Sequence, residues 1–539
     1  MDIETEVLVI GAGPVGLALA IELGTRGVRT LVVERNDRGG TAPRAKTTNV
    51  RTRTHLRRWG IADQLAAASP FGIDYPNNMV FVTRLAGREL ARFSNAFNAS
   101  PERDPRYPEH GQWIPQYTLE KVMLDKARTL PGVDIRFRCN FVTATQDASQ
   151  VQSELRNANG ETIRVRSRYL IGADGARSTV RDLIGAKMEG RYGLSHHYNV
   201  IFRAPGLTQA HGHGPAAIYW QIGKDGFSAI GPMDTDDRWF FMPGGAKPGQ
   251  SMPKDDAAAL IRDRTGIDLP YEILSADSWI ASELLADRYA DRRILLAGDA
   301  CHLHPPAGGY GMNMGVGDGI DLGWKIAATL QGWGSEELVA SYETERRPVH
   351  KVVIDEAMAN FAIYVAPPPP EIEDETPTGE AIRAKVGAGV QSSKAREFAT
   401  LGTVLGLCYH SPLISDEPEG DKAPPHDSQV YVPCARPGCL APHAWLADGR
   451  SLYDLFGQGF TLLVVEEVEV EAEVDAAVRE AERLGAPLAV VRPKGLDPAT
   501  LYGAPLALIR PDQHVAWRGS KWTGALARAI GRGTTVDSA

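Results

Sequence analysis

A glycine-rich turn near the N-terminus carries the first residues that could do chemistry. The motif Gly11-Ala12-Gly13-Pro14-Val15-Gly16 follows the apolar run Val7–Ile10 and opens an Ala- and Leu-rich stretch. In such a motif the first glycine permits a tight turn, the second lets the backbone approach a pyrophosphate, and the third lets helix and strand pack closely. Glu34 stands 18 residues after Gly16, where a carboxylate can accept hydrogen bonds from both ribose hydroxyls of an adenosine. The motif predicts dinucleotide binding but does not separate FAD from NAD.

Two further acid-containing motifs lie far along the chain. The segment 169–178 reads YLIGADGARS and places Asp174 and Arg177 after an apolar strand. The segment 293–302 reads RILLAGDACH, with Asp299, and continues through PPAGGYGMNMG at 305–315 to Asp318. A glycine-rich loop that leads into a helix presents backbone N–H groups and suits an anion. Singly, each Asp could be a helix cap and Arg177 a solvated ion-pair partner; as an ordered set they indicate one nucleotide site.

Alternating strands and helices must position these motifs. Val7–Ile10, the run 28–33 and Tyr169–Gly172 are apolar without polar alternation, which is typical of buried parallel strands. Pro14–Thr25 and a stretch near 118–130 have helical composition, and Gly27 ends the first of them. The pattern predicts an α/β fold that begins with a Rossmann-like βαβ unit.

Other parts of the chain have a different pattern. Residues near 76–100 and 185–285 hold short aromatic strand-like runs, such as 217–222 and 239–242, between Gly, Asp and Pro turns. We predict an antiparallel sheet that forms a second domain. Pro- and Asp-rich segments at 366–380 and 411–428 indicate extended connections around a helical stretch at 381–410. The tail predicts a small α/β domain, with strands at 460–465 and 487–491, a helix at 474–484 and a hairpin at 506–517.

The ordered motifs resemble those of the group A flavoprotein aromatic hydroxylases, a family that includes para-hydroxybenzoate, phenol, chlorophenol and polyketide hydroxylases. The GxGxxG motif, the DG motif around Asp174 and the GD motif around Asp299 appear in the family's order. The resemblance implies that the cofactor is FAD, with NADPH or NADH as co-substrate. It also implies four parts: an FAD-binding domain at 1–75, 101–184 and 286–365, a substrate-binding β-sheet domain at 76–100 and 185–285, a helical connection at 366–428, and a thioredoxin-like domain at 429–539.

The resemblance assigns roles to single residues. Asp299 would hold a ribityl hydroxyl of FAD, and the glycine-rich loop after it would present N–H groups to the flavin pyrimidine edge. Gln116 matches a glutamine that bonds the ribityl chain, and Arg44 matches an arginine near the FAD phosphates and the nicotinamide. Arg44, with the backbone of Pro306 and Gly308, is expected to shape the flavin environment during catalysis. The expected cofactor-binding residues are Gly11, Gly13, Pro14, Val15, Gly16, Glu34, Arg35, Arg44, Gln116, Asp174, Asp299, Pro306, Gly309, Gly311, Met312 and Asn313.

The activity implied is hydroxylation of a phenolic or related aromatic ring. NAD(P)H would reduce FAD, O₂ would add at flavin C4a, and the hydroperoxide would transfer OH to the ring in a site that excludes water. A substrate pocket would draw on His197, Tyr219, Trp220 and Phe241, although a core or surface role is the commoner one for each. The segment 46–49 lacks the aspartate that phenol hydroxylase carries near there, so we assign no base for phenol deprotonation. An oxidase, an antibiotic-modifying monooxygenase and a flavin-binding protein without turnover remain alternatives.

The tail resembles the thioredoxin-like domain fused to many of these hydroxylases. The match rests on Pro437-Gly438, Ala441-Pro442-His443, Asp454-Leu-Phe-Gly457 and Arg510-Pro511-Asp512. Redox thioredoxins need a CxxC motif, whereas four residues separate Cys434 from Cys439. We therefore expect a structural role or a contact within a homodimer rather than disulfide exchange.

Composition narrows the remaining function classes. The five cysteines, Cys139, Cys301, Cys408, Cys434 and Cys439, are few and scattered, which predicts free thiols in a reducing cytoplasm. A net charge of −9 argues against a nucleic-acid partner. The sequence contains no run of 18 apolar residues, so we expect no membrane span. The N-terminus has no features of a secretory signal, so we expect none. No cluster has metal-ligand spacing, although His302 and His304 are close, so we expect no metal.

Overall fold

The structure is a computed structural model that describes residues 2–38, 45–246, 251–361, 367–416, 424–465, 470–494 and 501–533. Its first unit is the predicted βαβ arrangement of β2 (Val7–Ile10), α1 (Pro14–Thr25) and β3 (Thr30–Glu34). β2 and α1 have the predicted bounds, and β3 begins two residues later than predicted. All side chains of both strands are buried, which explains why neither shows polar alternation.

A six-stranded sheet places the sequence motifs. Its order is β18 (Ala290–Asp291), β19 (Ile294–Leu296), β12 (Tyr169–Gly172), β2, β3 and β8 (Val133–Phe137), and all neighbours except β18 and β19 are parallel. The three motifs follow the carboxyl ends of β2, β12 and β19. These strands are adjacent and parallel, so the motifs meet at one edge of the sheet, where open α/β sheets bind their ligands.

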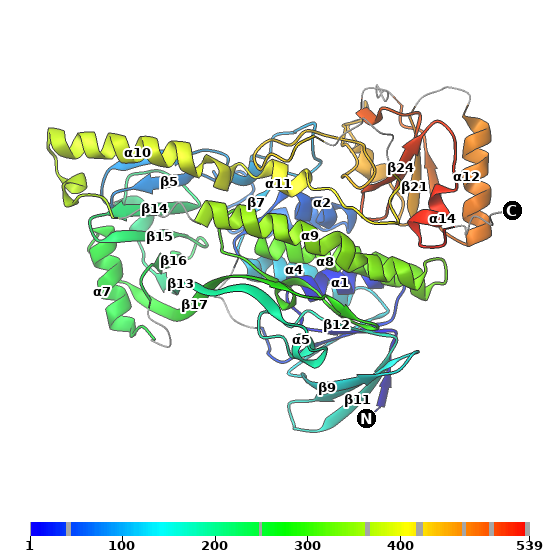
Figure 1. The fold of residues 1–539 in the computed structure, drawn as a ribbon. Coiled ribbons are helices and arrows are strands. Elements are labelled where there is room, and N and C mark those ends of the chain that lie inside the picture. Colours follow the sequence, from blue (N-terminus) through cyan, green and yellow to red (C-terminus); the bar gives the residue numbers. More distant parts are fainter. Residues whose placement is uncertain are drawn as a thin grey trace.

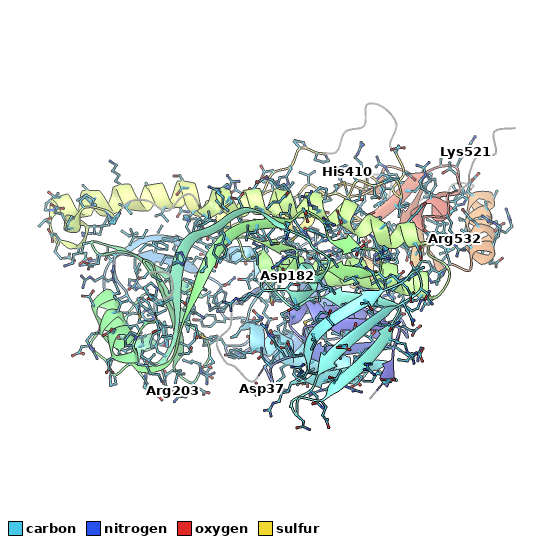
Figure 2. All side chains as sticks on the ribbon, turned by 60° about the horizontal axis from the view of Figure 1, so that its bottom comes forward. Asp37, Asp182, Arg203, His410, Lys521 and Arg532 are labelled. Carbon is cyan, nitrogen blue, oxygen red and sulfur yellow. A yellow bond between two sulfur atoms is a disulfide. The ribbon has the colours of Figure 1, made fainter. Side chains whose placement is uncertain are left out.

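Helices and a second small sheet cover this central sheet. α1 packs with α4 (Gln116–Arg128) and α8 (Gly311–Leu330) on one side. The small sheet contains β1 (Asp2–Glu4), β9 (Asn140–Gln146), β10 (Val151–Arg156) and β11 (Thr162–Ser167). It lies on the side away from α1 and α8 in Figure 1 and is turned toward the viewer in Figure 2. The other short elements in this part of the chain are β4 (Thr47–Thr48), α2 (Val50–Arg58), α3 (Ala62–Ala67), η1 (Ala96–Asn98), β7 (Gln112–Trp113), α5 (Thr179–Leu183), α6 (Leu207–Ala210) and η2 (Gly298–Ala300).

The predicted second sheet has eight strands. Its order is β20 (His302–Leu303), β17 (Glu272–Ala286), β13 (Met188–Arg203), β16 (Arg238–Pro243), β15 (Gly226–Pro232), β14 (Ile218–Gly223), β5 (Met79–Val82) and β6 (Glu89–Phe93). The prediction of an antiparallel sheet is wrong at one place, since β5 and β14 are parallel. Residues 83–217 separate β5 from β14 in the sequence and include strands of the other sheets. No tight turn therefore joins the two strands and forces them to run antiparallel. α7 (Lys254–Thr265) covers one face, and the long strands β13 and β17 run together toward α9 (Figure 1).

The connection is more helical than predicted. α9 (Glu336–Phe361) is followed by η3 (Pro370–Glu373), α10 (Pro377–Phe398) and α11 (Leu401–Leu405). α10 begins inside the segment 366–380 that we predict to be extended. The reason is local, because the Thr376 side chain caps the helix and Pro377 occupies its first turn, where proline costs no hydrogen bond.

The tail forms the predicted small α/β domain. Its sheet has the order β22 (Leu488–Val491), β21 (Phe460–Val464), β23 (Leu506–Ile509) and β24 (Val515–Gly519), with only the first pair parallel. η4 (Leu452–Leu455), α12 (Glu471–Leu484) and α14 (Ala525–Ala529) complete it. This is the arrangement of a thioredoxin-like domain. In the described parts of the chain, no helix combines the length and apolarity that crossing a bilayer requires.

The prediction that all cysteines are free thiols is wrong for one pair. Cys408 and Cys439 form a disulfide, with their Cα atoms 4.1 Å apart. The segment after α11 runs beside the start of the tail domain, where the Tyr409 N–H donates to the Gly438 carbonyl at 2.8 Å. Because the two cysteines are 31 positions apart in the sequence, their spacing gives no sign of this pairing. Cys139, Cys301 and Cys434 are free.

The tail domain is fixed to α8 and α9 by a buried ionic cluster. The Arg510 guanidinium is 3% exposed and contacts Asp321, Glu345 and Asp512 at 3.1, 2.8 and 2.8 Å. Lys325 contacts Asp321 and Glu345 at 2.9 and 2.7 Å. Two cations thus neutralise most of the charge of three buried carboxylates. An apolar contact lies beside them, since the Phe460 ring packs edge-on against Trp324 of α8.

We predict that Arg510→Met destabilises the chain by about 3–5 kcal/mol, because the substitution leaves three buried carboxylates with one lysine. Urea unfolding followed by tryptophan fluorescence measures this change. Arg450→Met is the matched control: Arg450 is 60% exposed and pairs with Asp448, so its loss costs at most about 1 kcal/mol. Equal unfolding midpoints for the two variants would contradict the assignment of Arg510 as an anchor.

Candidate active site

The glycine turn at the carboxyl end of β2 is shaped to hold an anion. Gly11 has a φ of +105°, and a Cβ there would lie 2.3 Å from the Ala173 carbonyl oxygen. A Cβ on Gly16 would lie 1.8 Å from the Gly11 carbonyl oxygen. At Gly13, in contrast, a Cβ would meet only the Arg38 guanidinium among the described residues, at an ordinary contact distance of 3.8 Å, so these residues leave the backbone open on that side. No side chain that the structure describes caps the N-terminus of α1, so its first N–H groups are suited to bind a phosphate.

The residues next to this turn have structural partners. Pro14 occupies the first turn of α1. The Val15 side chain packs against Gly298, so that a Cβ on Gly298 would lie 2.7 Å from Val15 Cγ2. The Glu34 carboxylate accepts from the Ala12 N–H at 3.1 Å and from the Asn36 N–H at 3.0 Å. Glu34 thus lies at the rim of the turn, as its spacing predicts, whereas the Arg35 side chain is exposed.

Asp174 has a local role at the carboxyl end of β12. Its carboxylate accepts from the Ser178 hydroxyl at 2.5 Å and from the N–H groups of Thr179 and Val180 at 2.7 and 3.2 Å. It therefore stabilises the start of α5, and burial raises the pKa of this carboxyl. The Arg177 side chain is exposed.

The loop after β19 leads into α8. Asp299 lies half-buried in η2, Pro306 is exposed, and Met312 is half-buried against the main core. Gly308 and Gly309 have φ values of +92° and +67°, a region that favours glycine. Among the described residues, no side chain caps α8 at its start at Gly311, so the first N–H groups of the helix have no intrahelical partner.

Asn313 ties this loop to the segment 45–52, and Gln116 ties the same segment to α4. The Asn313 amide donates to the carbonyls of Thr47 and Gly309 at 2.9 and 2.7 Å and accepts from the Asn49 N–H at 3.0 Å. The Gln116 side chain accepts from the Ala45 N–H at 3.1 Å. Both side chains are thus engaged within the protein, beside the place where the resemblance expects the flavin. Arg44 lies outside the described residues.

Asp318 on α8 is a site residue to which sequence reasoning gives no role. Its carboxylate is fully buried and accepts from the Gly298 N–H at 3.0 Å, next to Asp299. It also contacts the Arg346 guanidinium at 2.8 Å, and the imidazoles of His302 and His350 at 2.8 and 2.9 Å. Burial alone would raise the pKa of Asp318, but the basic groups around it hold that pKa well below its usual range. A buried, ionised carboxylate therefore positions the loop that carries Asp299.

Two partners of Asp318 come from α9. Arg346 and His350 are four residues apart and so share a face of that helix. This spacing is the one signal in the sequence for their role. Arg346 also donates to the Met314 carbonyl at 2.9 Å and to the Tyr409 hydroxyl at 3.0 Å. Cys301, His302 and Asp318 lie close enough to share a metal ion, but both Asp318 oxygens already accept from protein donors.

The sheet separates the four residues predicted for a substrate pocket. Strand register places Phe241 level with Val200, and Tyr219 level with Ile230. Phe241 and Tyr219 therefore share one face of the sheet, where they pack beneath α7. Trp220 points to the opposite face, as does Phe240. By alternation along β13, His197 shares this second face with Ile201, which pairs with Phe240. Only His197 and Trp220 thus lie on the Phe240 face, where the ammonium of Lys46 sits 3.9 Å above the Phe240 ring.

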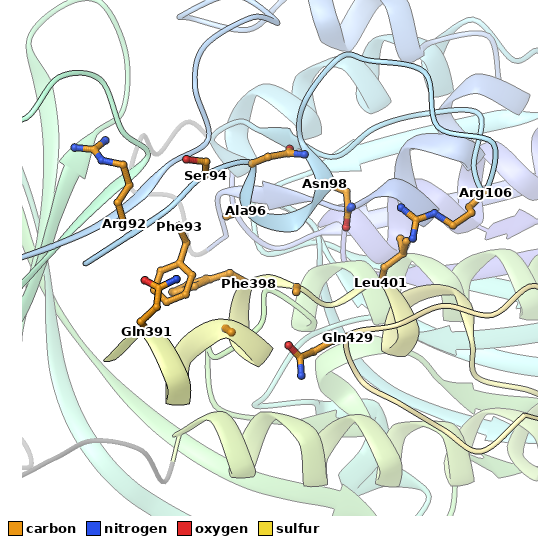
Figure 3. A pocket seen from close by; sticks show the side chains of 13 residues that line it. Arg92, Phe93, Ser94, Ala96, Asn98, Arg106, Gln391, Phe398, Leu401 and Gln429 are labelled. Carbon is orange, nitrogen blue, oxygen red and sulfur yellow. The ribbon is translucent and has the colours of Figure 1, made fainter. Parts of the chain in front are cut away.

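A pocket of about 350 Å³ lies at the edge of this sheet (Figure 3). Figure 3 shows Phe93 and Arg92 from β6 opposite Phe398 and Gln391 from α10. Its two arginines are already paired, Arg92 with Glu89 and Arg106 with Asp104. Phe398 packs against Phe81, which stacks on Trp220. The pocket is therefore connected by aromatic packing to the Phe240 face, but no residue predicted for the site lines it.

Comparison with known proteins identifies the family. The family described as FAD binding domain matches residues 4–357, and the one described as aromatic-ring hydroxylase, C-terminal, matches residues 435–533. A 2,4-dichlorophenol 6-monooxygenase of Delftia acidovorans is 32% identical, over 96% of both chains. The chain belongs to the FAD-dependent aromatic-ring hydroxylases. This hydroxylase is also 32% identical to a phenol 2-monooxygenase of a Pseudomonas species, over 96% of its own length and 90% of the relative's.

Solved structures agree with this family. The rebeccamycin biosynthetic enzyme RebC with reduced flavin has a TM-score of 0.90 and 33% identity, covering 99% of this hydroxylase and all of RebC. An aklavinone-11 hydroxylase with FAD and aklavinone has a TM-score of 0.81 and 30% identity, with the same coverage. FAD is therefore the cofactor of this hydroxylase, which is an FAD-dependent aromatic-ring monooxygenase.

We predict that Asp318→Asn weakens FAD binding by about tenfold or more, because the amide cannot hold Arg346 and the Gly298 N–H together as the carboxylate does. Titration of the apoprotein with FAD, read by flavin fluorescence, measures the change. The control is Asp125→Asn, because Asp125 is an exposed residue of α4 that pairs with Lys121. An unchanged dissociation constant in a folded Asp318→Asn protein would show that Asp318 does not position the flavin loop.

Proposed function

We propose that this hydroxylase uses NAD(P)H and O₂ to add one hydroxyl group to a phenolic ring. The observation that carries the proposal is the placement of the glycine loop at 308–311 close to an aromatic sheet face that holds one lysine, Lys46. Thr47 links the two, because it packs against Gly309 and its carbonyl accepts from Asn313. Relatives named for dichlorophenol, phenol and 4-methyl-5-nitrocatechol support a phenolic substrate.

The residues at the edge of the parallel sheet fit FAD. The open backbone at Gly13 and the uncapped start of α1 suit the pyrophosphate, with Pro14, Val15 and the two flanking glycines setting the turn. Glu34 would bond the adenosine ribose. Asp299 and Gln116 would hold the ribityl chain. The uncapped N-terminus of α8 at 311–313 would face the pyrimidine edge of the flavin, where its N–H groups favour negative charge.

The chemistry divides between cofactor and protein. FAD, when bound, supplies electron transfer from NAD(P)H and the activation of O₂. The protein's part is to orient the ring, to exclude water and to favour the phenolate, which is the more electron-rich form. Trp220 is half-buried and would offer apolar surface for a flat ring, on the sheet face that also holds Phe240. Arg44 stays a predicted contact of the nicotinamide, and Pro306 and Gly308 stay predicted parts of the flavin environment. We expect a homodimer in the cytoplasm, where NAD(P)H is available.

Oxidation of NADPH and NADH by the purified, flavin-loaded protein in air tests the proposal against a panel of phenols. We expect a rate that a phenol stimulates and a product that is 16 mass units heavier, the mass of one added oxygen atom. The same reaction without the phenol is the control. NAD(P)H consumption that yields only hydrogen peroxide with every phenol would contradict the proposed substrate class.

A further inference from the structure

Lys46 stands between the glycine loop and the aromatic sheet face. Its Nζ lies 3.9 Å from the centroid of the Phe240 ring, on the face of the eight-stranded sheet that also holds Trp220. Its own carbonyl accepts from the Ile114 N–H at 2.8 Å, which fixes the backbone from which the side chain extends. Thr47, the next residue, packs against Gly309. The amine is thus placed at the boundary between the expected flavin site and the substrate face.

The ammonium of Lys46 has no carboxylate partner among the residues that the structure describes. Lys46 is half-buried, and the lysines that the structure describes as buried are both paired: Lys325 contacts Asp321 and Glu345, and Lys394 contacts Glu397 at 2.8 Å. At Lys46 the neighbour is an aromatic ring, which attracts a cation only weakly compared with a carboxylate. A cation that the fold leaves without a counter-ion is suited to an anion that binds later.

The pKa of Lys46 agrees with this reading. Burial lowers the pKa of its amine to about 8, and no charged group contributes to the shift. The amine lies over the Phe240 ring of β16, and Trp113 of β7 packs against that ring. At neutral pH the amine is therefore mostly protonated, although its environment disfavours the charge. An arriving anion would remove that penalty.

Other groups on this face are poorer candidates to hold an anion. Burial lowers the pKa of His197 to about 4, so this imidazole is neutral at pH 7, and it stacks on Trp279. Arg238 is a cation near Tyr117, but it already pairs with Asp234 at 2.9 Å. Lys46 is thus the described cation on this face that has no acidic partner.

We propose that Lys46 is the substrate-binding residue that holds the phenolate oxygen of the ring to be hydroxylated. This inference rests on the proposed function and names the form in which the substrate binds. The phenol loses its O–H proton to solvent, and the Lys46 ammonium compensates the negative charge that remains on the oxygen. No other bond forms or breaks in this step. The aspartate that the sequence lacks at 46–49 is then not needed as a base.

Binding of 4-nitrophenol tests the proposal, because its phenolate absorbs visible light and its ionisation can be followed on the flavin-loaded protein by difference spectra. We expect the pKa of the bound phenol to lie at least about one unit below that of the free phenol. Lys46→Met should abolish this shift and weaken phenolate binding at pH 7.5 by about tenfold, while FAD content and melting temperature stay unchanged. Lys46→Arg should restore most of the shift, since it keeps the charge.

Lys121→Met is the matched control, because Lys121 is a surface residue, 74% exposed, that pairs with Asp125. It should bind 4-nitrophenol as the unmodified protein does. The proposal is overturned if the unmodified protein does not bind 4-nitrophenol, or if Lys46→Met leaves the pKa of the bound phenol unchanged. These results are distinct from a failure of the proposed function, in which 4-nitrophenol would bind and ionise while no phenol is hydroxylated.

Discussion

The contact between the Asp318 carboxylate and the Gly298 N–H is the constraint on which the site depends. A fully buried carboxylate is costly, and it persists here because two imidazoles, one guanidinium and one backbone N–H surround it. These donors come from η2, β20 and α9, while Asp318 itself belongs to α8. One ionised side chain therefore fixes the relative positions of the four elements from which the loop around Asp299 is built.

The contacts around Asp318 continue through Arg346 and Tyr409 to the tail domain. Tyr409 bonds Arg346 at 3.0 Å, stacks on His514 with ring centroids 4.2 Å apart, and follows the disulfide-bonded Cys408. Glu345, the neighbour of Arg346 on α9, contacts Arg510. The tail domain, which has no CxxC motif, thus contacts α9 at Glu345, next to the Arg346 that holds Asp318. We therefore expect a structural role for the thioredoxin-like domain.

The sequence predicts the parallel core well and the substrate face poorly, for a physical reason. A buried parallel strand such as Tyr169–Gly172 is apolar on both faces, and the glycine turn depends on local geometry alone. The eight-stranded sheet is covered on both faces as well, so its aromatic residues do not reveal which side meets the substrate. Tyr219 and Trp220 are adjacent in sequence and point to opposite sides. Asp318 and Cys408 gain their roles only through partners that are distant in sequence.

The most direct test of this account is a crystal structure of the hydroxylase with FAD and 4-nitrophenol. The account predicts the flavin pyrimidine edge within about 3.2 Å of the N–H groups at the start of α8, and the phenol oxygen within the same distance of Lys46 Nζ. A flavin ring bound away from this helix, or a phenol whose oxygen points away from Lys46 while its ring lies against the Phe240 face, would contradict it.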